Sequence, residues 1–364
     1  MSMRERAAGT SCKTMHMRTL AAVAMLAAAA CAPAGLPTPS AAPTAVGTAA
    51  TVPGIVCEGA RGGPLADTTG ALPSSSGARR VTLFFATHTH GELVRPDGVT
   101  FAHYAGRVAE LRRALPDPSA SLFLGNGDDT TQRLCGVRTA GQHVVDAFNA
   151  GGLDANTFGF NEVAEDIAPD ELRALVAASR FTWLSANVLE LGGSDVFGKA
   201  EGARRWLVRD VGGVRVGLTG LVVPSPAQGV IPYSYGRNVK VIDPVDAMRE
   251  VLPLMRREGA QIVVVLSHMD IETMERVARE VDGIDAILGS HAWQPSAMKV
   301  VGKTILADGH DNMQQVGQLD LLVRDGAVAA HAFSVHGVRP SSPVHAEVAT
   351  ALARYVGPAK ATGP

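Results

Sequence analysis

The chain has 364 residues, of which 46% are hydrophobic and only 5% aromatic, with 39 glycines and 21 prolines. This length suits one large domain or two moderate ones, and the composition is that of a loop-rich globular α/β protein with a flexible segment. The formal net charge is −2 and no basic stripe is visible, which argues against a nucleic acid as the main partner.

The first 31 residues have the pattern of an export signal. Met17-Arg18 precedes TLAAVAMLAAAA, an apolar run that is too short to span a membrane as a mature helix and is typical of a signal peptide. The run ends at Ala28-Ala29-Ala30-Cys31, which resembles a bacterial lipobox, so we expect residues 1–31 to be a signal with Cys31 as the lipidated residue. A plain signal peptide cut nearby is the alternative. We therefore expect an exported, periplasmic or cell-envelope lipoprotein that is anchored to the membrane through this lipid.

Residues 32–78 are rich in Ala, Pro, Thr, Ser and Gly and contain little that could build a core. This composition predicts a flexible tether. In an oxidising compartment, Cys57 and Cys135 could form a disulfide that ties the end of the tether to the domain, and two free thiols are the alternative.

From Arg79 onward, strand and helix patterns alternate. Single strands are predicted at 80–86, 120–125, 181–185, 261–267 and 284–288, and helices at 101–114, 138–150, 244–258, 271–281 and from Pro169. Residues 203–223 predict two strands joined at Gly212-Gly213, a hairpin signal. Residues 297–336 are strand-like, with turns at Gly302-Lys303 and Asp325-Gly326. We expect one α/β domain over 79–338 whose final strands are antiparallel, followed by a short tail over 339–364.

Four apolar runs end at side chains that can bind a metal. They are VTLFFATHTHG (81–91), SLFLGNGDD (121–129), IVVVLSHMD (262–270) and IDAILGSH (284–291). The candidate ligands in them are His88, His90, Asp128, His268 and His291. Loops beyond the carboxyl ends of strands are where α/β folds gather their sites, and imidazole with carboxylate suits Zn, Mn and Fe. The pattern predicts a metal-dependent hydrolase.

These motifs, together with WLSANV (183–188), RVGLTGL (215–221) and VGQLDL (316–321), resemble the N-terminal domain of the 5′-nucleotidase family of calcineurin-like metallophosphoesterases. The resemblance covers nearly all of 79–325. It implies a four-layer αββα sandwich of two mixed β-sheets flanked by helices. It also implies a small phosphorylated substrate of the nucleotide class and divalent metal ions bridged by a shared Asp. Two such ions activate a water and stabilise charge on the phosphoryl oxygens.

The resemblance assigns ligand positions to His90, Asp128, His268 and His291, with Asp128 as the bridging carboxylate. His88 stands where the family has Asp. Ligation and a structural or solvent-facing role are equally open for His88, and imidazole there removes one negative charge from the site. Asp129, the neighbour of Asp128, could support it or face solvent, and we expect the latter.

Two motifs depart from the family pattern. Gly159-Phe160-Asn161-Glu162 stands in place of Gly-Asn-His-Glu, so Phe160 replaces a ligand and Asn161 replaces the catalytic His. Asn161 could take over a ligand or catalytic role after a shift of one residue, and Glu162 is a substitute acid or a structural residue. In the last motif Trp293 takes a ligand position, and Gln294 could serve only after a similar shift. Phe160 and Trp293 are apolar fill in a decayed site or a wall that stacks a substrate ring.

His310 is a further candidate ligand, because it lies where a late loop of the family approaches the site. The leading hypothesis is an exported phosphoesterase with one or two divalent ions. The alternative is a catalytically degenerate metal- or ligand-binding envelope lipoprotein of the same fold. A periplasmic thiohydrolase of sulfur oxidation ranks last, because its distinguishing motif is not evident. We expect the 26 residues of 339–364 to be too few for the family's C-terminal nucleotide-binding domain, which leaves substrate and oligomeric state open.

Overall fold

The computed structural model describes residues 67–73, 77–130, 133–134, 137–165, 167–223, 239–289, 297–309 and 312–355. Several predicted residues therefore lie outside the described residues: Cys31, Cys57, Cys135, His291, Trp293, Gln294 and His310. The described part belongs to one unit, Val46–Pro364. Within it, no helix has the length and apolar character needed to cross a membrane.

A four-stranded mixed sheet, which we call sheet A, has the strand order β16-β15-β1-β2. Its strands are β1 (Arg79–Phe85), β2 (Ser121–Phe123), β15 (Gln315–Arg324) and β16 (Ala327–Gly337). β1 runs parallel to β2 and antiparallel to β15, which pairs antiparallel with β16. The period-2 alternation of β1 sends Leu83 and Phe85 to one face and Phe84 to the other.

A six-stranded sheet, which we call sheet F, has the order β13-β14-β12-β11-β9-β8. Its strands are β8 (Trp206–Val211), β9 (Val214–Val222), β11 (Ile262–His268), β12 (Ala286–Gly289), β13 (Ala297–Val301) and β14 (Thr304–Asp308). The four inner strands are parallel and the two outer ones antiparallel. Short strand pairs lie beside the two sheets: β3 (Arg133–Leu134) with β4 (Val137–Arg138), β5 (Ala155–Thr157) with β6 (Thr182–Leu184), and β7 (Val188–Glu190) with β10 (Val239–Val241).

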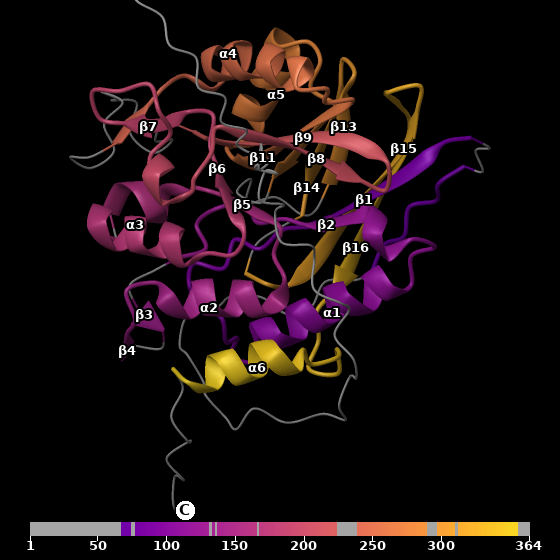
Figure 1. The fold of residues 1–364 in the computed structure, drawn as a ribbon. Helices are drawn as coiled ribbons and strands as arrows, with labels where there is room; N and C mark the ends of the chain where they lie inside the picture. Colours follow the sequence, from indigo (N-terminus) through magenta and orange to yellow (C-terminus); the bar gives the residue numbers. More distant parts are fainter. Residues whose placement is uncertain are drawn as a thin grey trace, which may run out of the picture. The chain divides into compact units, whose positions relative to one another are not determined.

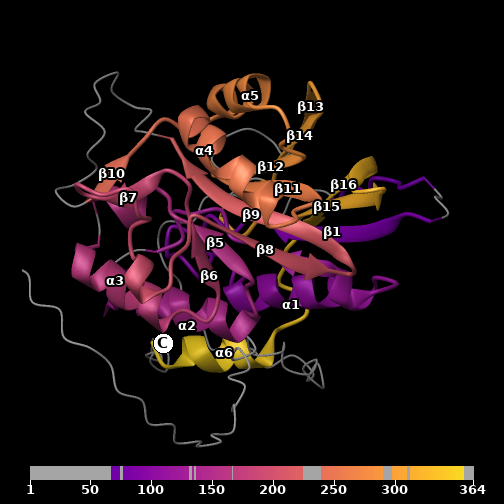
Figure 2. The same ribbon diagram turned by 45° about the horizontal axis from the view of Figure 1, so that its top comes forward.

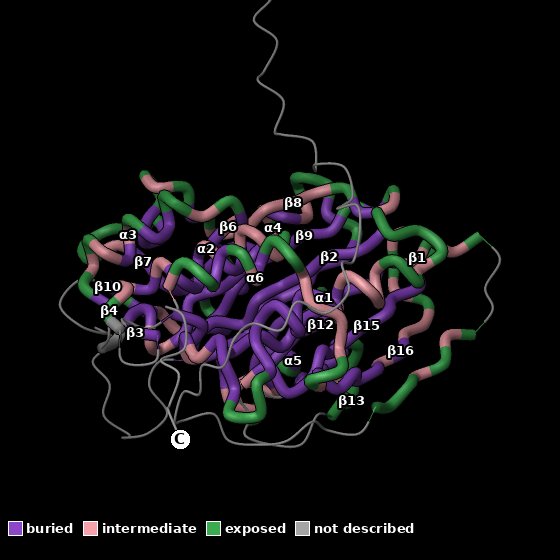
Figure 3. Tube along the Cα trace, turned by 90° about the horizontal axis from the view of Figure 1, so that it is seen from below, coloured by how far each residue is buried: buried purple, intermediate pink, exposed green. Residues whose placement is uncertain are grey.

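The two sheets pack face to face through buried aliphatic side chains such as Leu83 of β1 and Leu266 of β11. The helices are α1 (Phe101–Arg113), α2 (Gln142–Gly151), α3 (Pro169–Ala178), α4 (Pro244–Arg257), α5 (Ile271–Glu280) and α6 (Ala346–Ala353). α1, α2 and α6 lie on the outer side of sheet A, and α4 and α5 lie on the outer side of sheet F (Figures 1 and 2). The buried trace runs through the central strands, whereas exposed stretches lie at the periphery (Figure 3). The predicted four-layer αββα architecture is confirmed.

Every strand and helix predicted from the sequence is present, with shifted ends. The helix predicted from 138 begins only at Gln142, because Ala140 and Gly141 have positive φ values of 49° and 81°. As expected for the final strands, β13 pairs antiparallel with β14 and β15 with β16, whereas β14 also pairs in parallel with β12. The sequence interpretation missed β3, β4, β5, β7 and β10, which have only two or three residues each and so show little periodicity.

The two flanks of the predicted domain also carry structure. α6, in the predicted tail, packs on α1 and α2 through Val348 and Leu352. At the end of the predicted tether, Thr68 pairs with Val335 of β16 through two backbone hydrogen bonds of 2.9 Å. The described parts of both flanks therefore lie against the sandwich.

Candidate metal centre

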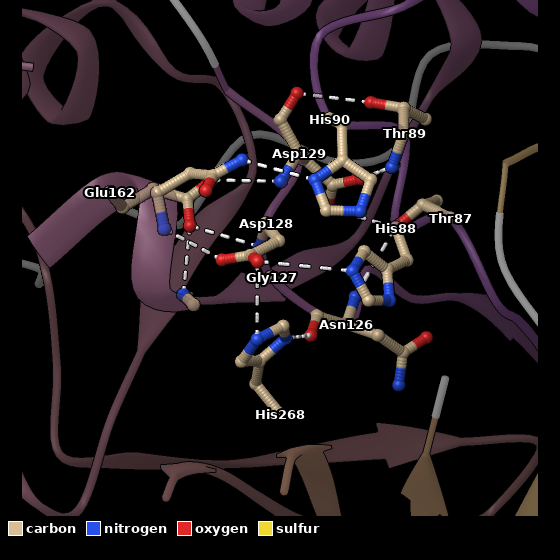
Figure 4. Close-up of polar contacts among 12 residues, drawn as sticks. Thr87, His88, Thr89, His90, Asn126, Gly127, Asp128, Asp129, Glu162 and His268 are labelled. Atoms are coloured by element: carbon tan, nitrogen blue, oxygen red, sulfur yellow. Dashed lines mark hydrogen bonds and ion pairs between the residues drawn. The ribbon is translucent and has the colours of Figure 1, made fainter. Parts of the chain in front are cut away.

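Three metal-binding side chains from the two sheets meet at the carboxyl ends of central strands. His88 follows β1, Asp128 follows β2, and His268 is the last residue of β11. One ligand atom from each of the three lies within 4.8 Å of the other two, and all three side chains are buried. Asp128 Oδ2 is 3.3 Å from His268 Nε2 and 3.8 Å from His88 Nε2 (Figure 4). This spacing and chemistry suit a shared cation.

The backbone on the sheet A side leaves strand geometry abruptly. Ala86, His88, His90 and Asp128 have φ values of 81°, 39°, 50° and 51°. Non-glycine residues in the left-handed region cost of the order of 1–3 kcal/mol each and persist only where the surroundings enforce them. Here Asn126 Oδ1 accepts a 2.8 Å hydrogen bond from the Ala86 amide. The strain is thus concentrated in the loops that turn His88 and Asp128 toward each other.

Two glycines allow these loops to approach each other closely. A Cβ on Gly127, whose φ is 77°, would lie 2.7 Å from the Gly159 nitrogen. A Cβ on Gly159 would lie 2.2 Å from the Asp128 nitrogen and 2.3 Å from Asp128 Oδ1. Contacts this short exclude any side chain, so both positions need glycine for the loop that carries Asp128 to adopt this path.

Glu162 holds the loop that carries Asp128 in place. Its carboxylate accepts hydrogen bonds from the amides of Gly159, Asp128, Asp129 and Thr130 and from Thr130 Oγ1, all between 2.8 and 2.9 Å. Burial, and next the charge of Asp128, raise the pKa of Glu162. Because donors occupy both carboxylate oxygens, the geometry supports a positioning role, and the catalytic role of Glu162 stays a prediction.

Asp129 does not face solvent, so that expectation is wrong. Its side chain is fully buried and accepts hydrogen bonds from Thr87 Oγ1 (2.8 Å), the Thr89 amide (3.0 Å) and Asn156 Nδ2 (3.0 Å). Burial, and then the charge of Glu162, raise the pKa of Asp129 to about 7. Asp129 thereby ties the loop after β2 to the loop after β1.

Asp128 and His268 shift each other's pKa across the cluster. Burial alone would raise the pKa of Asp128, but the charges of His268 and His88 and a hydrogen bond from the Asn161 amide hold it well below its usual range. Burial alone would lower the pKa of His268, but the Asp128 charge raises it overall. His268 Nδ1–H donates to the Asn126 carbonyl at 3.2 Å, which directs Nε2 at Asp128.

His90 lies beside the cluster and outside the group of three. Its ring centroid is 4.5 Å from that of His88, and its Nδ1 accepts a hydrogen bond from Asn161 Nδ2 at 3.1 Å. Its ligand role stays a prediction, as does the ligand or catalytic role of Asn161. Phe160 packs edge-on against His268, with ring centroids 5.5 Å apart and an interplanar angle of 82°. The Phe160 ring therefore borders the centre as an apolar wall.

Sequence reasoning missed two residues that hold these loops. Asn126 links the sheets, because its Nδ2 donates to the Leu288 carbonyl of β12 at 2.8 Å while its Oδ1 holds Ala86. The only local signal for it is its place between two glycines before Asp128. His143 is fully buried, and its Nε2–H donates to the Gly91 carbonyl at 2.9 Å. No sequence signal links His143 to a partner 52 residues away.

Sequence comparisons find nucleotidases. No protein-family profile matches the chain. A probable 5′-nucleotidase of Treponema pallidum is 26% identical over 185 residues, which are 51% of this chain and 30% of that protein. The trifunctional nucleotide phosphoesterase YfkN of Bacillus subtilis is 27% identical over 161 residues, or 41% of this chain and 11% of that protein. The matched stretch thus spans about a third or less of the length of these curated relatives.

Solved structures agree with this finding. The calcineurin-like phosphoesterase YfkN of Bacillus subtilis superposes with a TM-score of 0.61 at 19% identity, over 76% of this chain and 97% of that one. A 5′-nucleotidase precursor of Thermus thermophilus gives 0.61 at 22% identity, over 76% and 58% of the two chains. The sulfate thiohydrolase SoxB of Thermus thermophilus gives 0.66 at 19% identity, over 79% and 62%. The predicted resemblance to 5′-nucleotidases and the calcineurin-like phosphoesterase fold is confirmed.

Proposed function

We propose that this chain is a metal-dependent hydrolase of phosphate esters, with nucleotides as its substrate class. One observation carries the proposal: His88, Asp128 and His268 arrive from three strand ends and converge within 4.8 Å. Titratable groups with perturbed pKa values cluster at functional sites. The nucleotidase relatives supply the reaction class.

The residues present suit a divalent ion. Two imidazole nitrogens and one carboxylate oxygen are a common donor set for Zn, Mn and Fe. A bound divalent ion lowers the pKa of a water and offsets charge on phosphoryl oxygens. The chain's own residues position the metal-binding side chains. The backbone amide of Asn161 donates a 2.7 Å hydrogen bond to Asp128 Oδ1, and the Asn126 carbonyl orients His268. Asn161, on the His90 side, offers an amide donor that can bind a substrate oxygen but cannot give it a proton.

A test is to strip the purified full chain of metal, reload it with Zn, Mn or Co, and assay AMP, a UDP-sugar, cyclic nucleotides and a nitrophenyl phosphodiester. We expect turnover that falls by about a hundredfold or more in Asp128→Asn, since the ligand loses its charge. Asp146→Asn is the matched control, because Asp146 accepts from the Tyr355 hydroxyl on the far side of sheet A. Absence of turnover with every metal would contradict the proposal. Metal retained without turnover would then favour the degenerate binding protein.

We further propose that the protein is exported and lipid-anchored. The apolar run before Cys31 and the tether-like composition of 32–78 support this. Labelled palmitate fed to expressing bacteria should be incorporated into the wild-type protein and not into Cys31→Ser. Equal labelling of both would contradict the anchor.

A further inference from the structure

We infer that His88 makes this centre selective for borderline transition ions such as Zn²⁺ and Co²⁺ over Mg²⁺ and Ca²⁺. The inference rests on the proposed function in so far as the centre binds an ion. Mg²⁺ and Ca²⁺ take oxygen ligands almost exclusively. Imidazole suits Zn, Cu, Fe and Ni, and it is a poor ligand for the two hard ions. In the His88–Asp128–His268 group, two of the three donors are imidazole nitrogens.

The His88 ring is buried at the centre and packs against two other imidazole rings. His88 has a fully buried side chain, and its backbone carbonyl accepts a 3.1 Å hydrogen bond from the Asn312 amide. Its ring lies between those of His90 and His268, at centroid distances of 4.5 and 5.1 Å. Rotation away from Asp128 would disturb these ring contacts. A water oxygen therefore cannot readily replace this nitrogen to suit a hard ion.

The nearby carboxylates do not supply the missing oxygen donors. Asp129 and Glu162 are buried next to Asp128, but protein donors occupy their oxygens. Asp128 Oδ1 is likewise bonded to the Asn161 amide. Among the described residues of this cluster, Asp128 Oδ2 is the carboxylate oxygen aimed at both imidazoles. These carboxyl groups therefore hold the loops in position. Imidazole nitrogens remain the majority of the donor atoms that the group offers to an ion.

Charge favours histidine at this position as well. Asp128, Asp129 and Glu162 already place three carboxyl groups in adjoining buried loops. An acid at position 88 would be the fourth, and like charges in a low-dielectric region repel strongly. Imidazole supplies a donor atom without that repulsion. The affinity of the site for a cation therefore comes in part from the His88 nitrogen, which favours Zn²⁺ and Co²⁺ over Mg²⁺.

The test measures binding rather than turnover. Chelator-stripped full chain is titrated with Zn²⁺, Co²⁺ and Mg²⁺ in competition with a chromophoric chelator. Both His88→Asp and His88→Asn put an oxygen donor in place of a nitrogen donor, so the ratio of zinc affinity to magnesium affinity should fall in both. We expect a fall of about tenfold or more in His88→Asp and a smaller fall in His88→Asn. Glu92→Gln is the control: Glu92 is half-buried two residues beyond His90, so its loss changes local charge and leaves the donor set intact. Its ratio should match the wild type.

A wild-type readout keeps the inference testable if the variants misfold. X-ray absorption of the zinc-loaded protein should show at least two imidazole ligands at about 2.0 Å. An unchanged ratio in His88→Asp, an equal fall in Glu92→Gln, or fewer than two imidazoles would overturn the inference. If the protein bound zinc in preference to magnesium but showed no turnover, only the proposed hydrolase activity would be contradicted. If the protein bound no ion at all, both would fail.

Discussion

The candidate metal centre has a loop-built half, residues 86–91 and 126–130, and a strand-built half, His268 at the end of β11. The loop-built half contains four non-glycine residues with positive φ and depends on two buried acids. His268 pairs in regular register with Val222, and its Nδ1–H donates to the Asn126 carbonyl. Because His268 is the last residue of a parallel strand, the sheet already fixes the direction of its side chain. The loops must instead be bent and stabilised, so we expect the centre to be most vulnerable there.

The largest effect should follow Glu162→Gln. The amide nitrogen of glutamine would face N–H donors that Glu162 now satisfies, so buried groups lose their acceptor. We expect the free energy of unfolding to fall by about 3 kcal/mol, with loss of metal binding, measured by urea unfolding and zinc titration. Glu171→Gln, which loses only a surface pairing with Arg138, should cost less than about 1 kcal/mol. Equal costs would contradict the role of Glu162 in stabilising the loop-built half.

The next effect should follow Gly159→Ala. The new methyl group would overlap Asp128 and displace the loop, so we expect about 1–3 kcal/mol of lost stability and weaker zinc binding. Gly193→Ala is the matched control, because its Cβ would meet no atom closer than 3.5 Å. Thermal unfolding and zinc titration of both variants test this. Unchanged zinc affinity in Gly159→Ala would contradict the proposed role of the close loop contact.

The strand-built half should respond more mildly. Phe160→Leu removes the edge-on contact with His268, which should cost about 1 kcal/mol. Zinc affinity should change by no more than about threefold, since the sheet still sets the direction of His268. Zinc titration beside urea unfolding measures both. A loss of affinity as large as that of Gly159→Ala would show that the strand end needs its aromatic neighbour as much as the loops need theirs.

The smallest effect lies away from both halves, at the Arg173–Glu190 ion pair. The hydrogen bond from Arg173 lowers the pKa of Glu190 below its ordinary 4.5. Because the folded pKa is the lower one, the pair stabilises fully above pH 4.5 and loses its contribution as pH falls through the folded value. Arg173→Met should therefore cost less than about 1 kcal/mol at pH 7, and less still under acid. Urea unfolding at several pH values checks this, and a constant difference would contradict it.

Most strands and helices could be predicted from the sequence, because long apolar strands such as β11 and helices such as α1 carry strong periodic signals. Their arrangement as a four-layer sandwich was an implication of the family resemblance. The sequence also placed His88, Asp128 and His268 at strand ends. It could not predict that Asp129 is buried, because a Gly-Asp-Asp turn is typical of an exposed loop and its partner Thr87 is 42 residues away. Nor could it place α6, whose eight alanine-rich residues gain stability from packing on other helices rather than from propensity.

Both the proposed hydrolase activity and the inferred metal selectivity require that His88, Asp128 and His268 share one cation. Anomalous diffraction from crystals of the zinc-loaded chain, measured on both sides of the zinc absorption edge, would locate that cation. We predict a peak about 2.0–2.2 Å from Nε2 of His88, Nε2 of His268 and Oδ2 of Asp128. A zinc peak elsewhere, or none within reach of these three atoms, would contradict the account.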